Sequence, residues 1–526
     1  MKTRTTLMSA AAVTAALALT LSACGSGSSG STGAEGGKGG AVIVGTTDPI
    51  TALDPANSYD VGSQTVIQNI FQTLLTMPAG QQKPVPEAAK SCAWKGTTTY
   101  TCTMQSGLKF SNGDPLTAQD VKFSFDRLLG IKSPTGPSSL FTSVKSVAAP
   151  NASTVTFTLG QADALFPDRL AHSGASIVDR KVFPKDKPLG NDKVIGSGPY
   201  AIEKYTAGQQ VALKANPNYK GTVKLQNKQA VVEYFSQASA MKQAIEKGSI
   251  NVAYRTFSPT DVKSLRGEAA KGVKVVEGTG SEKRYLVFNT KAAPGQQKAV
   301  RQAVASSIDR SAIAKNVYDD TVTPLYSMVG NGDPGQVEAY RTLYGAAPDK
   351  AKAAKFLKDA GVKTPVSITL NYTPTHYGPA SADEYTEIQR QLQATGLFKV
   401  KLASTEWQQY LNSALKDHSF PAFQIGWVRD FPDPDNDLTT FFGKNAVVYT
   451  GYTSKPAEQA ISAEEAQTDQ SKRIPDLQKI QQIAAQDTPV IPLWQGKLIA
   501  VTRTGVSGTD QALDPMYFRL YELSAK

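Results

Sequence analysis

The segment Phe110-Ser-Asn-Gly-Asp-Pro-Leu-Thr-Ala-Gln-Asp-Val121 carries the strongest local structural signals of the 526-residue chain. Asn112-Gly113 is typical of a tight turn, because both residues tolerate the positive backbone φ that such turns need. Thr117 and Asp120 have the spacing of a capping box, with aspartate in place of glutamate, so we expect a helix to begin after Thr117. The spacing of the following apolar residues predicts the buried face of that helix: Val121, Phe125, Leu128 and Leu129.

Segments of strand and helix character alternate along the rest of the chain. Strands are expected at 41–45, 155–159, 285–289, 366–372 and 400–402. Helices are expected at 66–75, 240–248, 351–361, 384–396 and 476–485. Mixed strands and helices throughout predict the α/β class.

Four blocks of sequence resemble the family 5 extracytoplasmic solute-binding proteins, the peptide- and nickel-type receptors of ABC importers. Besides 110–121, they are Gly196-Ser-Gly-Pro-Tyr200, Val300-Arg-Gln-Ala-Val-Ala-Ser-Ser-Ile-Asp309 and Gly426-Trp-Val-Arg-Asp-Phe-Pro-Asp-Pro-Asp-Asn436. They occur in the family's order, and the resemblance spans nearly all of 41–526.

The resemblance implies a two-lobed, type II periplasmic-binding-protein-like fold with an extra subdomain inserted in lobe I. By block order, lobe I would comprise 41–58, 190–275 and 486–526, and the inserted subdomain would be 59–189. Lobe II would be 276–485. The family's role implies capture of a solute between the lobes and delivery to an ABC permease and ATPase complex.

The N-terminal residues predict export. Lys2 and Arg4 are basic, and the 17 residues from Leu7 to Ala23 carry no charge. A spanning helix needs about 20 apolar residues, so we expect a signal peptide over 1–23. Leu21-Ser22-Ala23-Cys24 resembles the bacterial lipobox, which implies lipidation of Cys24 and an anchor on the extracytoplasmic face of the cell membrane. The alternative is an ordinary signal peptide with a chance cysteine.

The composition of the remaining chain indicates a tethered globular body. Twelve of the sixteen residues in 25–40 are glycine or serine, which predicts a flexible linker over 24–40. Without Lys2 and Arg4, 54 basic and 45 acidic residues remain, an excess of nine. We found no dense basic stripe interleaved with aromatic residues, so nucleic-acid binding is not expected. We expect a monomer.

Cys92 and Cys102 lie symmetrically about Thr97, and Trp94 would face Tyr100 across the same turn. The pattern predicts a hairpin whose two cysteines could be bridged. Outside the cytoplasm such a pair should oxidise, although two free thiols remain the alternative. A metal site is not expected here, because no third or fourth ligand lies nearby in the sequence.

The resemblance also implies ligand-binding residues. In peptide-binding members the Trp-x-x-Asp of the last block supplies a carboxylate to the ligand's α-ammonium, which assigns that role to Trp427 and Asp430. Trp407 resembles a cleft tryptophan of the family. The alternatives are a solvated Asp430, a salt bridge from Asp430 to Arg429, and core packing for the two tryptophans.

Main-chain pairing of the ligand with exposed strands would supply further affinity. The resemblance places Asn57 and Tyr59 on one flank of a peptide and Val428 on the other. Arg429 adjoins the expected anchor and could compete for it. An arginine that reads the carboxyl end of oligopeptides has no clear counterpart between Trp407 and Trp427.

Other classes of function have weaker support. The chain lacks G-x-S-x-G, H-E-x-x-H and P-loop motifs, so we expect neither an enzyme nor a bound cofactor. Asp433, Asp435 and Asp437 begin like an EF-hand, but Leu438 and Lys444 stand at positions that need glycine and glutamate, so no metal is expected. An oligosaccharide or another small solute remains an alternative ligand. A chaperone-like or adhesive surface lipoprotein remains an alternative class.

Overall fold

The computed structural model describes residues 40–81, 83–255, 257–374, 376–378, 380–444 and 446–525. Gly39–Lys526 forms one compact unit. The predicted signal peptide, Cys24 and the linker up to residue 39 lie outside the described residues. Within the described part, no helix is both long enough and apolar enough to cross a membrane.

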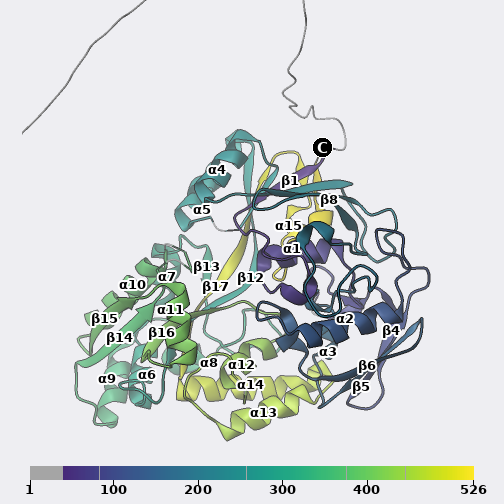
Figure 1. Ribbon diagram of the computed structural model, residues 1–526. Coiled ribbons are helices and arrows are strands. Elements are labelled where there is room, and N and C mark those ends of the chain that lie inside the picture. The colour runs from purple at the N-terminus through teal and green to yellow at the C-terminus, as the bar shows by residue number, and fades with distance from the viewer. Residues whose placement is uncertain are drawn as a thin grey trace, which may run out of the picture. The chain divides into compact units, whose positions relative to one another are not determined.

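A mixed eleven-stranded sheet runs through the unit (Figure 1). Its strands, in spatial order, are β15 (Phe398–Ser404), β14 (Val366–Tyr372), β16 (Ala422–Trp427), β12 (Val273–Phe288), β17 (Val490–Arg503), β11 (Val252–Tyr254), β1 (Val42–Thr46), β10 (Gln229–Tyr234), β9 (Gln210–Ala215) and β8 (Tyr200–Thr206). The short strand β13 (Val322–Pro324) pairs with β17. Two two-stranded sheets, β2 (Leu75–Thr76) with β3 (Val85–Pro86) and β18 (Val506–Ser507) with β19 (Ser524–Ala525), lie apart from it.

Helices surround these strands, which confirms the predicted α/β class (Figure 1). They are α1 (Val61–Ile70), α2 (Ala118–Ile131), α3 (Phe166–Arg169), α4 (Ala238–Lys247), α5 (Pro259–Arg266), α6 (Lys298–Ala305), α7 (Arg310–Asn316), α8 (Ala339–Tyr344), α9 (Lys350–Asp359), α10 (Ala380–Ala394), α11 (Trp407–Leu411), α12 (Asp435–Phe442), α13 (Lys455–Glu465), α14 (Gln470–Asp487) and α15 (Thr509–Ala512).

The long strands β12 and β17 pair antiparallel and connect two hydrophobic cores. From Val273↔Arg503 to Thr279↔Lys497 they pair beside β11, and after a first register shift they pair from Lys283↔Gln495 to Val287↔Val490 beside β16, with a second shift between Arg284 and Tyr285. Side chains from the second part lie in the core formed with α6–α10, whereas those from the first part pack with β1, β11 and α4. The first register shift therefore lies between the cores.

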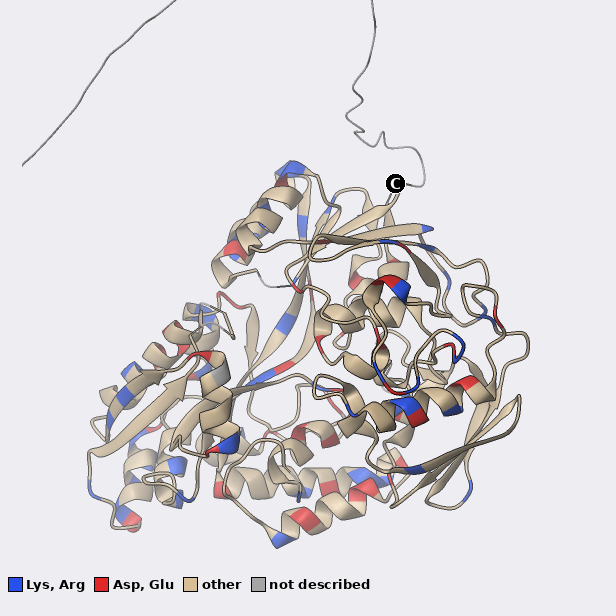
Figure 2. Ribbon diagram, in the orientation of Figure 1, with Lys and Arg blue, Asp and Glu red and all other residues tan. Residues whose placement is uncertain are grey.

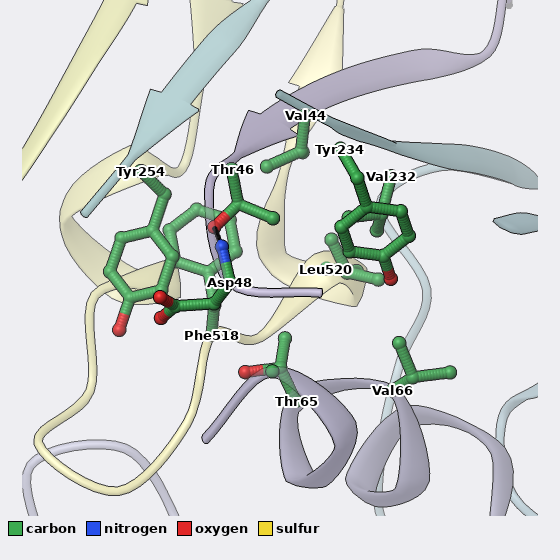
Figure 3. Close-up of a pocket in the computed structure, with 11 residues that line it drawn as sticks. Val44, Thr46, Asp48, Thr65, Val66, Val232, Tyr234, Tyr254, Phe518 and Leu520 are labelled. Atoms are coloured by element: carbon green, nitrogen blue, oxygen red, sulfur yellow. Dashed lines mark hydrogen bonds between the residues drawn. The ribbon is translucent and has the colours of Figure 1, made fainter. Parts of the chain in front are cut away.

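The core around β1 leaves a small cavity, in which Asp48 and Thr46 lie beside the rings of Tyr254 and Phe518 (Figure 3). The two ring centroids are 4.4 Å apart, and the Asp48 carboxylate pairs with Arg255 at 2.7 Å. The cavity volume is about 10 Å³, which is room for about one water molecule. This cavity is therefore too small for an organic solute.

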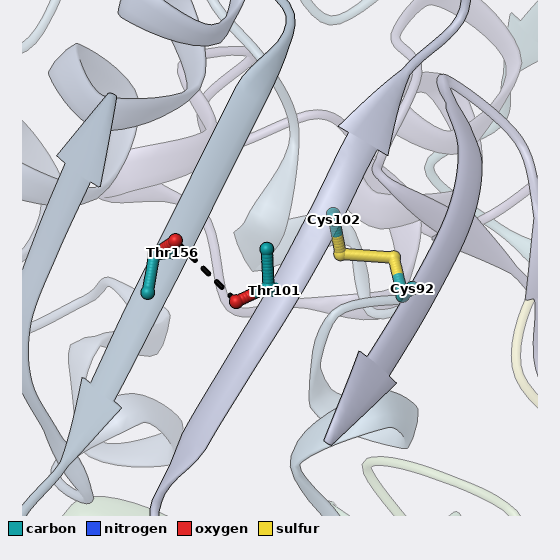
Figure 4. Close-up of a disulfide and its surroundings, with 4 residues drawn as sticks. All are labelled: Cys92, Thr101, Cys102 and Thr156. Carbon is teal, nitrogen blue, oxygen red and sulfur yellow. Dashed lines mark hydrogen bonds between the residues drawn. A yellow bond between two sulfur atoms is a disulfide. The ribbon is translucent and has the colours of Figure 1, made fainter. Parts of the chain in front are cut away.

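A separate four-stranded antiparallel sheet has the order β4 (Ala89–Trp94), β5 (Thr99–Met104), β7 (Thr154–Leu159) and β6 (Val144–Asn151). Cys92 pairs with Cys102 in register between β4 and β5, and a disulfide joins them (Figure 4). The predicted hairpin and its bridge are confirmed. The bridge closes a loop of about ten residues, which stabilises the fold by about 3 kcal/mol on the chain-entropy model.

The capping box at the start of α2 is confirmed, since both the Thr117 and the Asp120 side chains make its hydrogen bonds. The helix expected over 66–75 lies five residues too far along the chain, because α1 runs from Val61 to Ile70 and Leu75 begins β2. The reason is tertiary: the Ile70 carbonyl accepts a hydrogen bond from the Gly198 amide at 2.8 Å, so the chain leaves the helix there.

Charges of both signs are interspersed over the helices and strands of the described unit (Figure 2). This distribution agrees with the sequence, in which the basic excess is small relative to the number of charged residues. A surface of this kind carries no concentrated field for a polyanion.

Gly196 and Gly198 bring two of the quoted sequence blocks against the end of α1. A Cβ atom at Gly196 would lie 1.9 Å from the Ile70 carbonyl oxygen, and one at Gly198 would lie 2.5 Å from its carbonyl carbon. The Gly196 carbonyl accepts from the Ser111 amide at 2.9 Å. These glycines are required because backbone meets backbone at this junction.

We predict that Gly196→Ala lowers the free energy of unfolding by about 1–3 kcal/mol, because backbone atoms cannot rotate away from the added methyl group. The matched control is Gly130→Ala in α2, where a Cβ would meet nothing within 4 Å. That change should stabilise by about 0.5–1 kcal/mol through helix propensity. Urea unfolding of the two variants measures both effects. Equal changes of the same sign in the free energy of unfolding would contradict the close backbone contact at Gly196.

Candidate functional site

Asp430 follows β16 and forms a hydrogen-bonded contact with a residue 371 positions earlier in the chain. The Tyr59 hydroxyl donates to Asp430 Oδ1, and the Asn436 amide donates to Oδ2 at 3.2 Å. Burial raises the pKa of Asp430, while the hydrogen bonds from Tyr59 and Asn436 act in the opposite direction. Both hydrogen-bond donors among the described residues are neutral, and Arg169 acts on the carboxylate through its charge, without a hydrogen bond in the described structure.

Asn436, on α12, links the two residues of the Trp-x-x-Asp pattern. Its Oδ1 accepts from Trp427 Nε1 at 3.0 Å and from the Asp430 amide at 3.2 Å. Only 8% of Asn436 is exposed. We did not predict this role, although Asn436 ends the block that drew attention to Trp427 and Asp430.

Arg429 does not pair with Asp430, so the proposed competition between them is wrong. Its guanidinium bonds to Asp437 and to Asp333, and all three side chains are at least 84% buried. Lys283, opposite Trp427 in the β12–β16 ladder, donates to Asp437 at 2.8 Å. Burial and the neighbouring Arg429 lower the pKa of Lys283 to about 8.

This network of Lys283, Arg429, Asp333 and Asp437 fixes the chain that carries the anchor. Asp437 lies on α12 and Lys283 on β12, so their contact attaches the helix to the sheet. Arg429 is thereby bonded to carboxylates other than that of Asp430. The expected turn of acids and prolines at 433–437 is in part helical, since α12 begins at Asp435.

Trp407 begins α11 and lies in an aromatic group next to β16. Its ring stacks on His376 with centroids 3.5 Å apart and an interplanar angle of 3°. Tyr377 lies against the same indole at 5.5 Å, and its hydroxyl accepts from the Gly426 amide at 2.7 Å. Trp407 and Trp427 are partly buried and pack against the core of this half, as their alternative interpretation held.

Arg284 lies beneath this aromatic group and was not foreseen from the sequence. It pairs with Gly426 across the β12–β16 ladder, and its guanidinium lies 3.6 Å from the Tyr377 ring centroid. Its Nε and Nη1 atoms are buried and have no hydrogen-bond partner among the described residues. Two unused donors on a buried cation are costly unless another group or water satisfies them.

The remaining predicted residues divide into two groups. Tyr59 and Val428 are 39% and 38% exposed and lie at or beside the Asp430 contact. The Asn57 side chain instead accepts hydrogen bonds from Ser133 and Thr135, so it does not join the Asp430 contact. The Asn57 side chain therefore contacts the loop after α2, and its place on one flank of a bound peptide stays a prediction.

The acids that resemble an EF-hand opening are engaged with cations of the fold. Asp433 accepts two hydrogen bonds from Arg473, and Asp437 is bonded by Lys283 and Arg429. Within the described ranges, no three histidine, cysteine or acidic residues are placed to hold a metal ion.

We predict that Asp437→Asn lowers the free energy of unfolding by about 3–5 kcal/mol, because it leaves Lys283 and Arg429 buried with one carboxylate between them. The control is Asp126→Asn, which removes the solvent-exposed pair with Lys122 and should cost less than about 1 kcal/mol. Urea unfolding measures both. Similar small costs for the two variants would show that the buried network is not needed for stability.

Comparison with known proteins places this geometry in a family. The model of the bacterial extracellular solute-binding proteins, family 5 Middle, matches residues 83–448. Di/tripeptide-binding protein 3 of Pseudomonas aeruginosa is 28% identical over 479 residues, covering 84% of this chain and 86% of that protein. A probable D,D-dipeptide-binding periplasmic protein of Escherichia coli is 28% identical over 501 residues, covering 92% and 93%.

Solved structures agree with the fold. The ABC transporter-associated periplasmic binding protein DppA of Helicobacter pylori, in complex with the peptide STSA, matches with a TM-score of 0.76 at 22% identity. The match covers 93% of this chain and 98% of that one. The expected two-lobed fold is thus confirmed, and the family match confirms a transport receptor and not an enzyme. The chain belongs to the bacterial extracellular solute-binding proteins of family 5.

Proposed function

We propose that the protein captures short peptides between its lobes and delivers them to the permease and ATPase complex of an ABC importer. The observation that carries this proposal is the Asp430 carboxylate, which is held by two neutral donors while its neighbour Arg429 is bonded elsewhere. A poorly compensated carboxylate in a partly buried site favours a ligand that brings its own cation. The α-ammonium of a peptide supplies that charge.

Two tyrosine hydroxyls occupy positions that a peptide main chain could take. Tyr59 donates to Asp430, where an ammonium would donate. Tyr377 accepts from the Gly426 amide, where a peptide carbonyl would accept. In this proposal a bound peptide replaces both contacts and pairs along Gly426–Val428, as in β-strand addition.

Similarity to named peptide receptors supports this choice of ligand. The Pseudomonas and Escherichia relatives are named for di- and tripeptides and for D,D-dipeptides, and each aligns over most of this chain. An oligosaccharide receptor would use Trp407 and Trp427 as stacking platforms. One face of Trp407 is covered by His376, which favours the peptide over the sugar.

The segment boundaries and the anchor are part of the same proposal. Lobe I comprises 41–58, 190–275 and 486–526 with the inserted subdomain 59–189, and lobe II comprises 276–485. The first register shift in the β12–β17 pair is the hinge, so these strands extend into both lobes. We further propose that lipid on Cys24 holds a monomeric receptor beside its transporter, with 24–40 as the tether.

The test is calorimetric titration of the protein lacking residues 1–38 with Ala-Ala-Ala and with N-acetyl-Ala-Ala-Ala. We expect the free amine to bind at least about 30-fold more tightly, because acetylation leaves the Asp430 charge without its partner. Asp430→Asn should abolish this preference, and Asp126→Asn should retain it. Equal binding of both peptides by the unmodified protein would refute the ammonium anchor, and no binding of either would refute the peptide ligand.

A further inference from the structure

A group of charged side chains lies where the inserted segment 59–189 meets helices α12–α14, and we call it the acidic seam. The Ala164 amide donates to the Glu465 carbonyl at 2.8 Å, and the Arg169 guanidinium lies 4.9 Å from the Phe431 ring centroid. The members of the seam are Asp163, Asp168, Arg169, Asp433, Asp435, Glu464, Glu465 and Arg473. Six carboxyl groups thus share two guanidinium groups.

The two guanidinium groups are already engaged. Arg169 bonds to Asp163 at 3.1 Å. Arg473 bonds to Asp433 through two hydrogen bonds and to Glu464 through a third. Asp168, which is 5% exposed, has no salt bridge among the described residues, and its Oδ1 is buried without a partner.

A buried carboxylate without a partner is costly unless water, a metal ion or a proton satisfies it. A metal is not favoured, because among the described residues no three acids are placed to hold one. Protonation is compatible with these contacts, because a protonated carboxyl group carries no charge and needs no counter-ion. Lys83 lines the same pocket as Asp168, but the salt bridges of the described chain do not join the two.

We propose that Asp168 binds a proton when the inserted segment closes onto α12–α14, so that solute capture is coupled to proton uptake. The proposal rests on the receptor function above, because it requires this seam to open and close. When the seam opens, Asp168 separates from Asp433 and Arg473 and regains solvent. A proton is then released, as for an ordinary exposed aspartate.

The groups around Asp168 favour its protonated form in the closed state. Burial, and next the Asp433 carboxylate, raise the pKa of Asp168 to about 8, against smaller opposing effects of Arg473 and Arg169. From its own segment the Tyr100 ring faces it, and the pKa of that phenol is raised to about 12 by burial and by Asp168. A pocket of about 280 Å³, lined also by Trp94, Asp469 and Lys83, adjoins the carboxyl group.

The direction of the pH effect follows from the two states. An exposed aspartate has a pKa of about 4, and the closed state raises it, so closure is easiest at acidic pH and becomes harder as the pH rises towards 8. Asp430 acts oppositely, because it must be ionised to hold an ammonium group. Both proteins contain Asp430, so comparing the Kd of Asp168→Asn with that of the unmodified protein separates the pH effect of Asp168 from the pH effect of Asp430.

The experiment is titration with Ala-Ala-Ala at pH 5, 6.5 and 8, in phosphate and in Tris, whose ionisation enthalpies differ. We expect the unmodified protein to take up protons on binding and Asp168→Asn to take up fewer. The Kd of the unmodified protein, divided by that of Asp168→Asn, should rise about tenfold or more from pH 5 to pH 8. Asp126→Asn should behave like the unmodified protein.

A constant ratio with equal proton uptake would overturn the inference while leaving peptide capture intact. Absence of peptide binding at every pH would instead refute the proposed function, and thermal unfolding then tests the seam in the closed arrangement that the structure shows, in which the Ala164 amide already contacts α13 at Glu465. The midpoint of Asp168→Asn, relative to the unmodified protein, should rise with pH, because asparagine removes a cost that grows with pH. A pH-independent difference in midpoint would overturn the proton site.

Discussion

The antiparallel pairing of β12 with β17 is the constraint on which the rest of the structure depends. These two strands contribute to the core around α6–α10 and to the smaller core beside α4, and the first break in their register lies between these cores. Lys283 and Arg284 follow this break directly, so the same strand that joins the halves also carries two buried cations. Relative movement of the halves would bend these strands, and β12 also pairs with β16 beside the site.

The buried cations determine which charges remain free at the site. Lys283 and Arg429 are satisfied by Asp437 and Asp333, at the junction of β12, β16 and α12. Because Arg429 is engaged there, Asp430 is left to neutral donors, although the two residues are adjacent in sequence. Stability and selectivity are therefore linked: the ion network that attaches α12 also engages the guanidinium of the residue adjacent to the proposed anchor.

Features that depend on a dozen neighbouring residues could be predicted from the sequence. The Thr117–Asp120 capping box and the Cys92–Cys102 hairpin are of this kind, since turn and cap geometry are local. The early end of α1 was missed because the carbonyl of Ile70 is taken by Gly198, far along the chain. Helical spacing of apolar residues carries no information about such a distant partner.

The contacts of the candidate site were even harder to predict from the sequence, because they join residues that are far apart in the chain. Resemblance to a family directed attention to Tyr59 and Asp430, whose contact spans 371 residues. No periodicity or spacing connects them. Adjacency in sequence suggested Asp430 as an alternative partner of Arg429, whereas the acceptors are eight and 96 residues away. The fold determines which charged residues come into contact, so the ion pairs are the part of the site that is hardest to predict from the sequence.

Asp430 and the acidic seam share one feature, an excess of buried negative charge, and we propose a different compensation for each. Each places carboxyl groups in a partly or fully buried environment with fewer cations than negative charges. At Asp430 the missing charge would come from the solute, and at Asp168 it would be removed by a proton. Because closure would bury both, a receptor of this design binds its solute and its proton in one step, and the free energy of either contributes to closing the lobes.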